Sequence, residues 1–281
     1  MARNRRPTFA EVVSTEYLTP AMIRVWLSAP GGGRLPIEFP GYTDSYVKLL
    51  LPRPGSGLTS PFDPDEVKEQ LAPEFWPVMR TYTIRLWDEA SGHMAIDVVV
   101  HGDKGIAGPW AVAARPGDQV QFRGPGGAYR PDPEADWHLL VGDESALPAI
   151  AAATEALPDD ARAVVLIEVA DAAEEQDLTL PSGARVQWIH RDTSDKAPGI
   201  ELVQTVRDLD FPAGRVHAFV HGDATCVREI RSYLRFDKEV PKEDLSVSGY
   251  WRRGLDDEAW RAAKAEWKAQ VEADEAAHAA A

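Results

Sequence analysis

The sequence is poor in cysteine, in net positive charge and in long apolar runs. Cys226 is the single cysteine among 281 residues, which excludes a disulfide, a zinc cluster or an iron–sulfur centre built on several thiols. Asp and Glu number 45 against 30 Lys and Arg, so the net charge of −15 excludes a chain-wide basic surface for nucleic acid. No stretch approaches the ~20 apolar residues of a membrane span, and the basic N-terminal segment has no apolar stretch behind it. We expect a soluble, cytoplasmic monomer that binds neither nucleic acid nor membrane.

The first part of the chain has the pattern of short β-strands. At 281 residues and 44% hydrophobic content, the chain is long enough for two globular domains. Apolar and polar residues alternate in segments separated by turns, over residues 9–14, 22–28, 46–51, 81–87, 93–101 and 119–123. The one helical segment expected among them is 64–74. Six such strands predict a closed antiparallel barrel.

The pattern changes after the Pro-rich linker 130–134. Apolar strands are expected at 137–141, 163–170, 186–189, 216–220 and 245–248, with helices at 145–157 and 225–236. Alternating strands and helices predict a doubly wound parallel sheet. A final helix over 256–281, capped by Asp256 or Asp257, carries Trp260, Trp267 and Val271 on one stripe and should dock on this domain. The predicted domains are therefore 1–130 and 131–281.

Two motifs in the barrel segment suit a phosphate-bearing aromatic ligand. In Arg80-Thr81-Tyr82-Thr83, Arg80 and Tyr82 share one strand face, so a cation lies beside a flat ring. Such alternation is common on exposed sheets, so by itself it is weak evidence for a binding site. The loop HGDKGIAGPWA, residues 101–111, has three glycines and a proline suited to the first helical position, where backbone amides could meet a diphosphate.

Five segments, taken in order, resemble the siderophore-interacting protein family. They are RTYT (80–83), HGDKGIAGPWA (101–111), GPGG (124–127), GDESALPAI (142–150) and GYWRRG (249–254). This family comprises flavin-dependent ferric-siderophore reductases related in fold to ferredoxin–NADP reductases. The resemblance implies that the barrel binds FAD and that the α/β domain receives NADPH or NADH. It further implies that the redox chemistry is carried by the cofactor, with no catalytic side chain and no metal ligand.

The resemblance also implies roles for particular residues. Those implied around FAD in the barrel are Arg80, Tyr82, Thr83, Asp97, Val99, His101, Gly102, Ala107, Gly108 and Trp110. Those implied near the flavin or nicotinamide in the second domain are Asp143, Glu144, Ser145, Ala146, Tyr250 and Trp251. Lys48, Arg252 and Arg253 are implied as contacts of the siderophore. Two structural alternatives stay open: acidic helix capping by Asp143 and Glu144, and an aromatic seal formed by Tyr250 and Trp251.

The chain departs from the family pattern at two positions beside Lys48. Tyr46 stands where the family commonly has histidine, and Gly126 where relatives often have arginine. With fewer cations expected at the flavin edge, we hypothesise a less charged ferric chelate, such as a hydroxamate, rather than a trianionic catecholate.

The implied reaction takes electrons from NAD(P)H through FAD to Fe(III) in a ferric siderophore and releases Fe(II). The electron donor stays open. The acidic strand end Glu168-Val169-Ala170-Asp171 would suit a free ribose hydroxyl, whereas Arg191 or the Arg252–Arg253 pair would suit a 2′-phosphate. The alternatives are a ferredoxin-coupled or general flavin reductase and a non-catalytic siderophore-binding protein that handles iron. Cys226, in an apolar helical context, is expected to be buried and inert.

Overall fold

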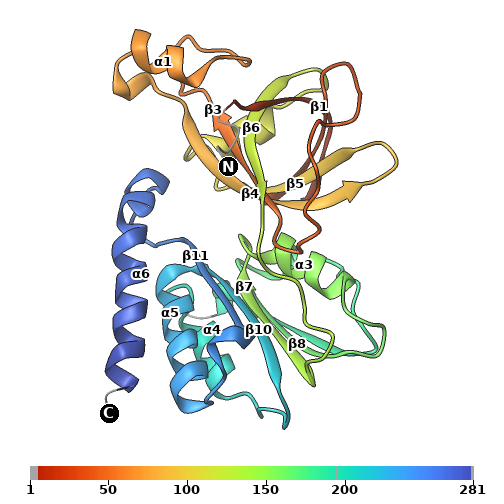
Figure 1. Ribbon diagram of the computed structural model, residues 1–281, viewed down its shortest axis with the longest axis vertical. Coiled ribbons are helices and arrows are strands. Elements are labelled where there is room, and N and C mark those ends of the chain that lie inside the picture. The colour runs from red at the N-terminus through yellow and green to blue at the C-terminus, as the bar shows by residue number, and fades with distance from the viewer. Residues whose placement is uncertain (1–5, 194, 280–281) are drawn as a thin grey trace. The chain divides into compact units, whose positions relative to one another are not determined.

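The computed structural model describes residues 6–193 and 195–279. The chain divides into two compact units, one ending at Ala128 and the other beginning at Tyr129 (Figure 1). Among the helices of the described residues, none has both the length and the apolar composition that a membrane span requires.

The first unit is a closed antiparallel barrel, which confirms the predicted architecture. Its strands follow the order β1-β2-β5-β4-β3-β6. Their bounds are Thr8–Thr19 (β1), Met22–Ser28 (β2), Tyr46–Leu51 (β3), Val78–Asp88 (β4), His93–Val99 (β5) and Gln119–Gly126 (β6). Alternate residues of each strand point inward, so that Val47, Leu49 and Phe122 are fully buried in one apolar cluster. The residues between them face outward.

Two short helices interrupt the barrel strands. α1 spans Pro64–Gln70, capped by the Asp63 side chain, and a separate 3₁₀ turn follows at Pro73–Phe75. The single helix predicted over 64–74 was therefore wrong at its end, because Pro73 holds Ala72 in an extended conformation that cannot continue a helix. α2 spans Ala107–Ala113, so Pro109 is its third residue and not its first.

The second unit is the predicted parallel sheet with helices on both faces. The strand order is β11-β10-β7-β8-β9, with bounds Trp137–Asp143 (β7), Arg162–Val169 (β8), Gly183–His190 (β9), Val216–Asp223 (β10) and Leu245–Trp251 (β11). The helices are α3 (Leu147–Glu155), α4 (Ile200–Arg207), α5 (Ala224–Ser232) and α6 (Asp257–Ala279). Helices α4, α5 and α6 pack on one face, and α3 lies on the other (Figure 1). From β7 the chain adds β8 and β9 on one side and then β10 and β11 on the other, so the strand order switches between β7 and β10. Parallel sheets of this kind bind ligands at such a switch point.

Several elements differ from their predicted extents. α4 was not predicted; it has only eight residues, of which Leu202, Val203 and Val206 are buried. β11 runs three residues past the predicted end, because Asp223 of β10 pairs with Trp251. α5 begins at Ala224 and continues into a π-helical turn at Tyr233–Asp237.

The C-terminal helix α6 docks on the α/β unit, as its apolar stripe predicted. Trp260 and Trp267 are buried in the core of this unit, and Val271 packs against the same cluster. The indole of Trp267 donates to the carbonyl of Ala224 at 2.9 Å, and Asp256 accepts from the amide of Ala259 at 2.8 Å as the helix cap. The predicted end of this helix, 280–281, lies outside the described residues.

Candidate functional site

Strand β4 carries the RTYT motif on both faces of the barrel wall. Arg80 and Tyr82 lie opposite Leu49 and Val47 of β3, so they share the inward-pointing face, as predicted from the alternation. Tyr82 is half-buried and packs against the barrel core, while the Arg80 guanidinium donates to the carbonyl of Met79 at 3.1 Å. Thr83 lies on the opposite, outer face and is buried. The structure therefore places Thr83 away from Arg80 and Tyr82 although all three are on one strand.

Asp97 on β5 has a partner within the barrel. Both of its carboxylate oxygens accept hydrogen bonds from Arg24 of β2, at 2.7 and 2.8 Å, and the carboxylate is buried. A bidentate pair of this kind is a strong charge-assisted contact. Asp97 thus stabilises the β2–β5 pairing, and its contact with a flavin stays a prediction.

The glycine-rich loop after β5 exposes its backbone. His101 and Gly102 are exposed, and Gly102 has a φ of +61°, a conformation that L-residues rarely adopt. A Cβ at Gly102 would meet no atom within 4 Å, so the backbone is open to a ligand there. Because β4 and β5 are antiparallel neighbours, this loop follows β5 at the end of the barrel where β4 begins.

The chemistry of these groups fits FAD. Arg80 offers a cation for a phosphate, the partly exposed ring of Tyr82 offers a surface for a planar ring system, and the loop offers accessible amides. Within the seven-residue α2, Ala107 and Gly108 are buried and Trp110 packs partly on the barrel core. The individual flavin contacts of these residues, and of Val99 on β5, stay predictions.

In the α/β unit, Asp143 connects the ends of three segments. It is the last residue of β7, 5% exposed. One oxygen accepts from the amide and hydroxyl of Ser145; the other accepts from the amide of Asp223 at 2.9 Å and the indole of Trp251 at 2.8 Å. Burial raises the pKa of Asp143, with the neighbouring Glu144 acting in the same direction, while the hydrogen bonds from the Ser145 hydroxyl, the Trp251 indole and the Asp223 amide oppose the rise. Because both oxygens face only donors, we describe the group as a carboxylate that fastens β7, the β10–α5 turn and β11 together.

Glu144 and Glu168 hold Arg191. The guanidinium donates to both oxygens of Glu144 and lies 3.6 Å from Glu168. Burial opposes the charge of Arg191, but the hydrogen bonds and charge of Glu144, with the charge of Glu168, raise its pKa overall. Burial raises the pKa of Glu168, whose two oxygens also accept from the amide of Gly199, 2.9 Å each. Arg191 is thus already neutralised, which argues against a role with a 2′-phosphate.

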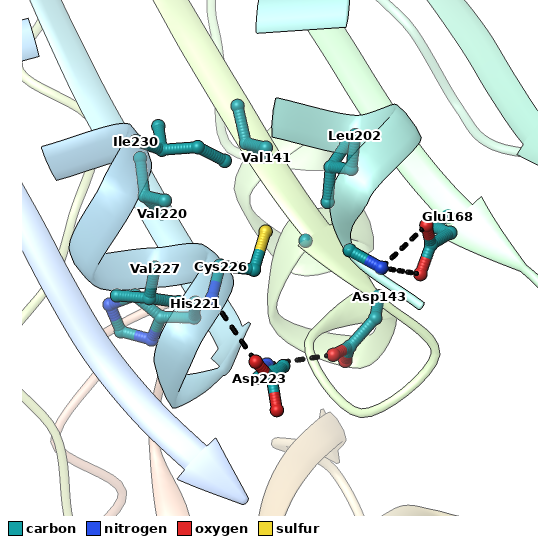
Figure 2. Close-up of a pocket in the computed structure, with 12 residues that line it drawn as sticks. Val141, Asp143, Glu168, Leu202, Val220, His221, Asp223, Cys226, Val227 and Ile230 are labelled. Carbon is teal, nitrogen blue, oxygen red and sulfur yellow. Dashed lines mark hydrogen bonds between the residues drawn. The ribbon is translucent and has the colours of Figure 1, made fainter. Parts of the chain in front are cut away.

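Figure 2 shows that the carboxylates of Asp143, Glu168 and Asp223 gather near one small cavity at the carboxyl ends of β7, β8 and β10. Asp223 caps α5 by accepting from the amides of Thr225 and Cys226 at 2.9 and 3.1 Å. The cavity measures about 10 Å³, which is no more than one water molecule needs. Cys226 faces it, is buried, and has its pKa raised by burial. The cavity itself therefore cannot hold a nucleotide, and any nucleotide must bind outside it.

The end of β11 carries the remaining predicted residues. The Tyr250 hydroxyl lies 2.9 Å from Nδ1 of His221, whose pKa burial lowers to about 3. Trp251 is fixed by its bond to Asp143, whereas Arg252 and Arg253 are exposed and form no side-chain ion pair within the part of the chain that the structure describes. Gly249-Tyr250-Trp251, expected after the last strand, is part of it.

The structure thus joins some predicted residues and separates others. Asp143, Ser145 and Trp251 belong to one hydrogen-bond network, and Ala146 is buried beside it as the residue before α3. Of the two acids expected to cap a helix, Asp143 does bind the amide of Ser145, whereas Glu144 pairs with Arg191. The sequence did not indicate Arg24, Asp223 or Gly199 as partners of these residues. Glu168 was expected as part of an acidic strand end, but its contacts with Arg191 and Gly199 were not. For Asp223 a signal was present, since an aspartate directly before a helical pattern is typical of a cap.

Comparison with known proteins identifies the family. Residues 11–129 match the siderophore-interacting FAD-binding domain, and residues 135–254 match the siderophore-interacting protein model. The ferric vibriobactin reductase ViuB of Vibrio cholerae is 34% identical over 260 residues, covering 90% of this chain and 92% of ViuB. The NADPH-dependent ferric-chelate reductase of Escherichia coli is 28% identical, covering 74% of this chain and 79% of the relative.

A solved structure extends this similarity. The siderophore utilization protein from T. fusca superimposes with a TM-score of 0.76 and 38% identity, covering 89% of this chain and 94% of that one. Each family model matches one of the two units: the FAD-binding model covers the barrel, and the other model covers the α/β unit. The chain therefore belongs to the siderophore-interacting protein family.

Proposed function

We propose that this protein is a flavin-dependent reductase that passes electrons from a reduced nicotinamide nucleotide, through FAD, to Fe(III) in a ferric siderophore, and so releases Fe(II). The observation that carries the proposal is the FAD-binding family match over residues 11–129 on a barrel that places Arg80, Tyr82 and the open Gly102 loop at one end. The names of the two ferric-reductase relatives support the reaction type. The cytoplasmic location and the monomeric state stay predictions.

When bound, FAD supplies the conversion of a two-electron hydride donor into single-electron steps that Fe(III) can accept. The chain's own residues bind and orient it. Arg80 would hold a phosphate group, Tyr82 would pack against the ring system, and the hydroxyl of Thr83 would offer a hydrogen bond from the outer face of β4. One NAD(P)H carries two electrons, so it can reduce two Fe(III) ions. Fe(II) binds hard oxygen chelators more weakly than Fe(III), so reduction releases the metal.

For the electron donor, we propose a nicotinamide nucleotide bound at the carboxyl edge of the parallel sheet. Arg191 is held by Glu144 and Glu168, whereas Arg252 and Arg253 are exposed and, among the described residues, have no ion-pair partner, so they are the candidates for binding a phosphate. The E. coli relative is named as NADPH-dependent, which supports NADPH for this chain. A ferredoxin donor, or siderophore binding without reduction, would be a different outcome of the same experiment.

Anaerobic spectroscopy of the purified protein tests the proposal. Bound flavin is measured first, then its bleaching by NADPH or NADH, and then its reoxidation by a ferric siderophore in the presence of a ferrous-iron trap. We expect bleaching, reoxidation and two trapped Fe(II) per NAD(P)H. A colourless protein, or a flavin that NAD(P)H does not bleach, would contradict the proposal.

A substitution at Lys48 can distinguish the two half-reactions, which are the reduction of the flavin by NAD(P)H and its reoxidation by a ferric siderophore. The Lys48 ammonium lies 5.6 Å from the Tyr46 ring, on the outer face of β3 and opposite Thr81, two residues along β4 from Thr83. We expect Lys48→Ala to slow the reoxidation of flavin by a ferric siderophore about tenfold, because a cation near the anionic acceptor is lost. Bleaching by NAD(P)H should not change. Stopped-flow rates of both steps check this, and equal losses in both would argue against the role.

A further inference from the structure

The outer face of β4, β3 and β6 presents three rows of side chains. Thr83, Tyr46 and Gly126 form one row, and Met79, Leu50 and Gln121 form another. Between them lies the row of Thr81, Lys48 and Arg123. Because directly paired residues of antiparallel strands point to the same side, Arg123 lies beside Lys48 on the outer face.

Arg123 has no hydrogen-bond or ion-pair partner among the described residues. It is half-buried, and its Nε is fully buried without an acceptor. A buried donor without an acceptor is destabilising and is rare in folded proteins. Two cations directly opposite each other in a sheet are also destabilising. Neither feature helps the barrel to fold.

The next outward residue on the same strand provides a contrast. Gln121 is fully buried, its amide nitrogen donates to the carbonyl of Phe62 at 2.9 Å, and its amide oxygen accepts from the Phe62 nitrogen at 2.8 Å. The chain thus satisfies the polar group at one end of this face and leaves the guanidinium two residues later unsatisfied. The buried Nε is closed to an external ligand, but the terminal nitrogens of this half-buried guanidinium are not, and among the described residues they too have no acceptor. An external anion could bind there.

The row of Thr83, Tyr46 and Gly126 shows what borders Arg123. A Cβ at Gly126 would lie 2.8 Å from the ring of Tyr46, so this ring covers the space where a longer side chain would otherwise stand. Lys48 lies against the same ring, 5.6 Å from its centre. The face therefore offers a cation, a second cation with an unfilled donor, and an aromatic surface, next to the row that contains Thr83.

We infer that Arg123 binds an anionic oxygen of the ferric chelate, alongside Lys48. This inference rests on the proposed function and adds a contact that neither the motifs nor the family resemblance supplied. A guanidinium remains charged at every physiological pH and offers two parallel donors to an oxyanion. Arg123 thereby supplies, three residues earlier on β6, the positive charge that Gly126 does not. The inference therefore favours an anionic chelate over the less charged one hypothesised from Tyr46 and Gly126.

Binding measurements on the oxidised, FAD-loaded protein test the inference without turnover. A trianionic ferric tris-catecholate and an uncharged ferric tris-hydroxamate are titrated while flavin and tryptophan fluorescence are followed, at several salt concentrations. The variants are Arg123→Gln, Arg123→Lys and the matched control Arg115→Gln, which removes an exposed arginine beyond the other end of β6. Thermal unfolding of each variant is measured in parallel.

We expect Arg123→Gln to raise the Kd of the trianion about tenfold and to flatten its salt dependence, because a charge-assisted contact is lost. The uncharged chelate should change by less than about twofold, and Arg123→Lys should fall between wild type and Arg123→Gln. The melting temperature of Arg123→Gln should be unchanged or higher, because the repulsion of Lys48 is removed.

Three results would overturn the inference. Arg123→Gln could bind the trianion as tightly as wild type and Arg115→Gln do. Both chelates could lose affinity equally. The melting temperature could fall along with affinity, which would make Arg123 a structural residue. If wild-type protein retains no flavin or binds neither chelate, the proposed function fails with the inference; if wild type binds and Arg123→Gln is unchanged, the inference fails alone.

Discussion

The barrel and the α/β unit treat the amides near their candidate sites in opposite ways. In the barrel, the loop that includes Gly102 leaves its backbone exposed. At the carboxyl edge of the parallel sheet, Asp143 accepts from the amide of Ser145, Glu168 from that of Gly199, and Asp223 from those that begin α5. Exposed donors suit an anionic group that stays bound, whereas carboxylates already in place weaken the attraction for a second anion. The contrast suits a resident cofactor in the barrel and an exchangeable donor in the other unit.

The largest expected effect is on the network at the carboxyl edge. Asp143→Ala leaves four donors without an acceptor, two of them backbone amides. We expect it to lower the free energy of unfolding by about 3–5 kcal/mol, the range for breaking a buried charged network. Ser145→Ala removes one donor and should lower it by about 1 kcal/mol or less. Urea titration followed by tryptophan fluorescence measures both, and similar small losses would show that Asp143 does not fasten this edge.

Acid should weaken the same unit through its buried histidines. Burial lowers the pKa of His221 to about 3 and that of His138 to about 4, against an ordinary value of 6.5. Between about pH 6.5 and these lowered pKa values, the unfolded chain binds more protons than the native one. The free energy of unfolding therefore falls as pH decreases from about 6.5 toward 3. His221→Gln should make this decline shallower, whereas His101→Gln, at an exposed position, should leave it as in wild type. Urea titrations across this pH range decide; a decline of equal slope in all three proteins would contradict the assignment.

How much the sequence predicted differs between fold and site. The barrel and the parallel sheet were predictable because period-two alternation and the regular spacing of strands are local signals. The helix α4 was not, since eight residues with three buried apolar positions give too short a pattern. The alternation correctly predicted that Arg80 and Tyr82 share one strand face. The bond of Trp251 to Asp143, in contrast, joins residues 108 positions apart. No spacing rule predicts a contact that only the folded sheet creates, and the same holds for Arg24 with Asp97.

In the barrel, Arg80→Ala should weaken FAD binding. Loss of one guanidinium–phosphate contact should raise the Kd of FAD about 10- to 100-fold. The exposed Arg115, changed to Ala, gives the same loss of charge and should leave the Kd as it is. Equilibrium dialysis with the flavin-free protein measures both. If Arg80→Ala binds FAD with wild-type affinity, the barrel site does not depend on the cation beside Tyr82, and the contrast with the α/β unit fails for the barrel.

The smallest effect is expected at the donor site, where the comparison predicts weak binding. Replacing Arg252 and Arg253 together by Ala removes two exposed cations next to the capping residue of α5, since the amide of Arg253 donates to Asp223 at 3.1 Å. We expect the KM for NADPH to rise about threefold to tenfold and the KM for NADH to stay constant, because only NADPH carries the 2′-phosphate, and exposed charge contacts contribute about 1 kcal/mol or less. Arg261→Ala, in the exposed first turns of α6, is the control and should alter neither value. If both KM values rise together, the two arginines support the edge of the sheet or the nicotinamide half that both donors share, and the phosphate must be bound by other groups or not at all.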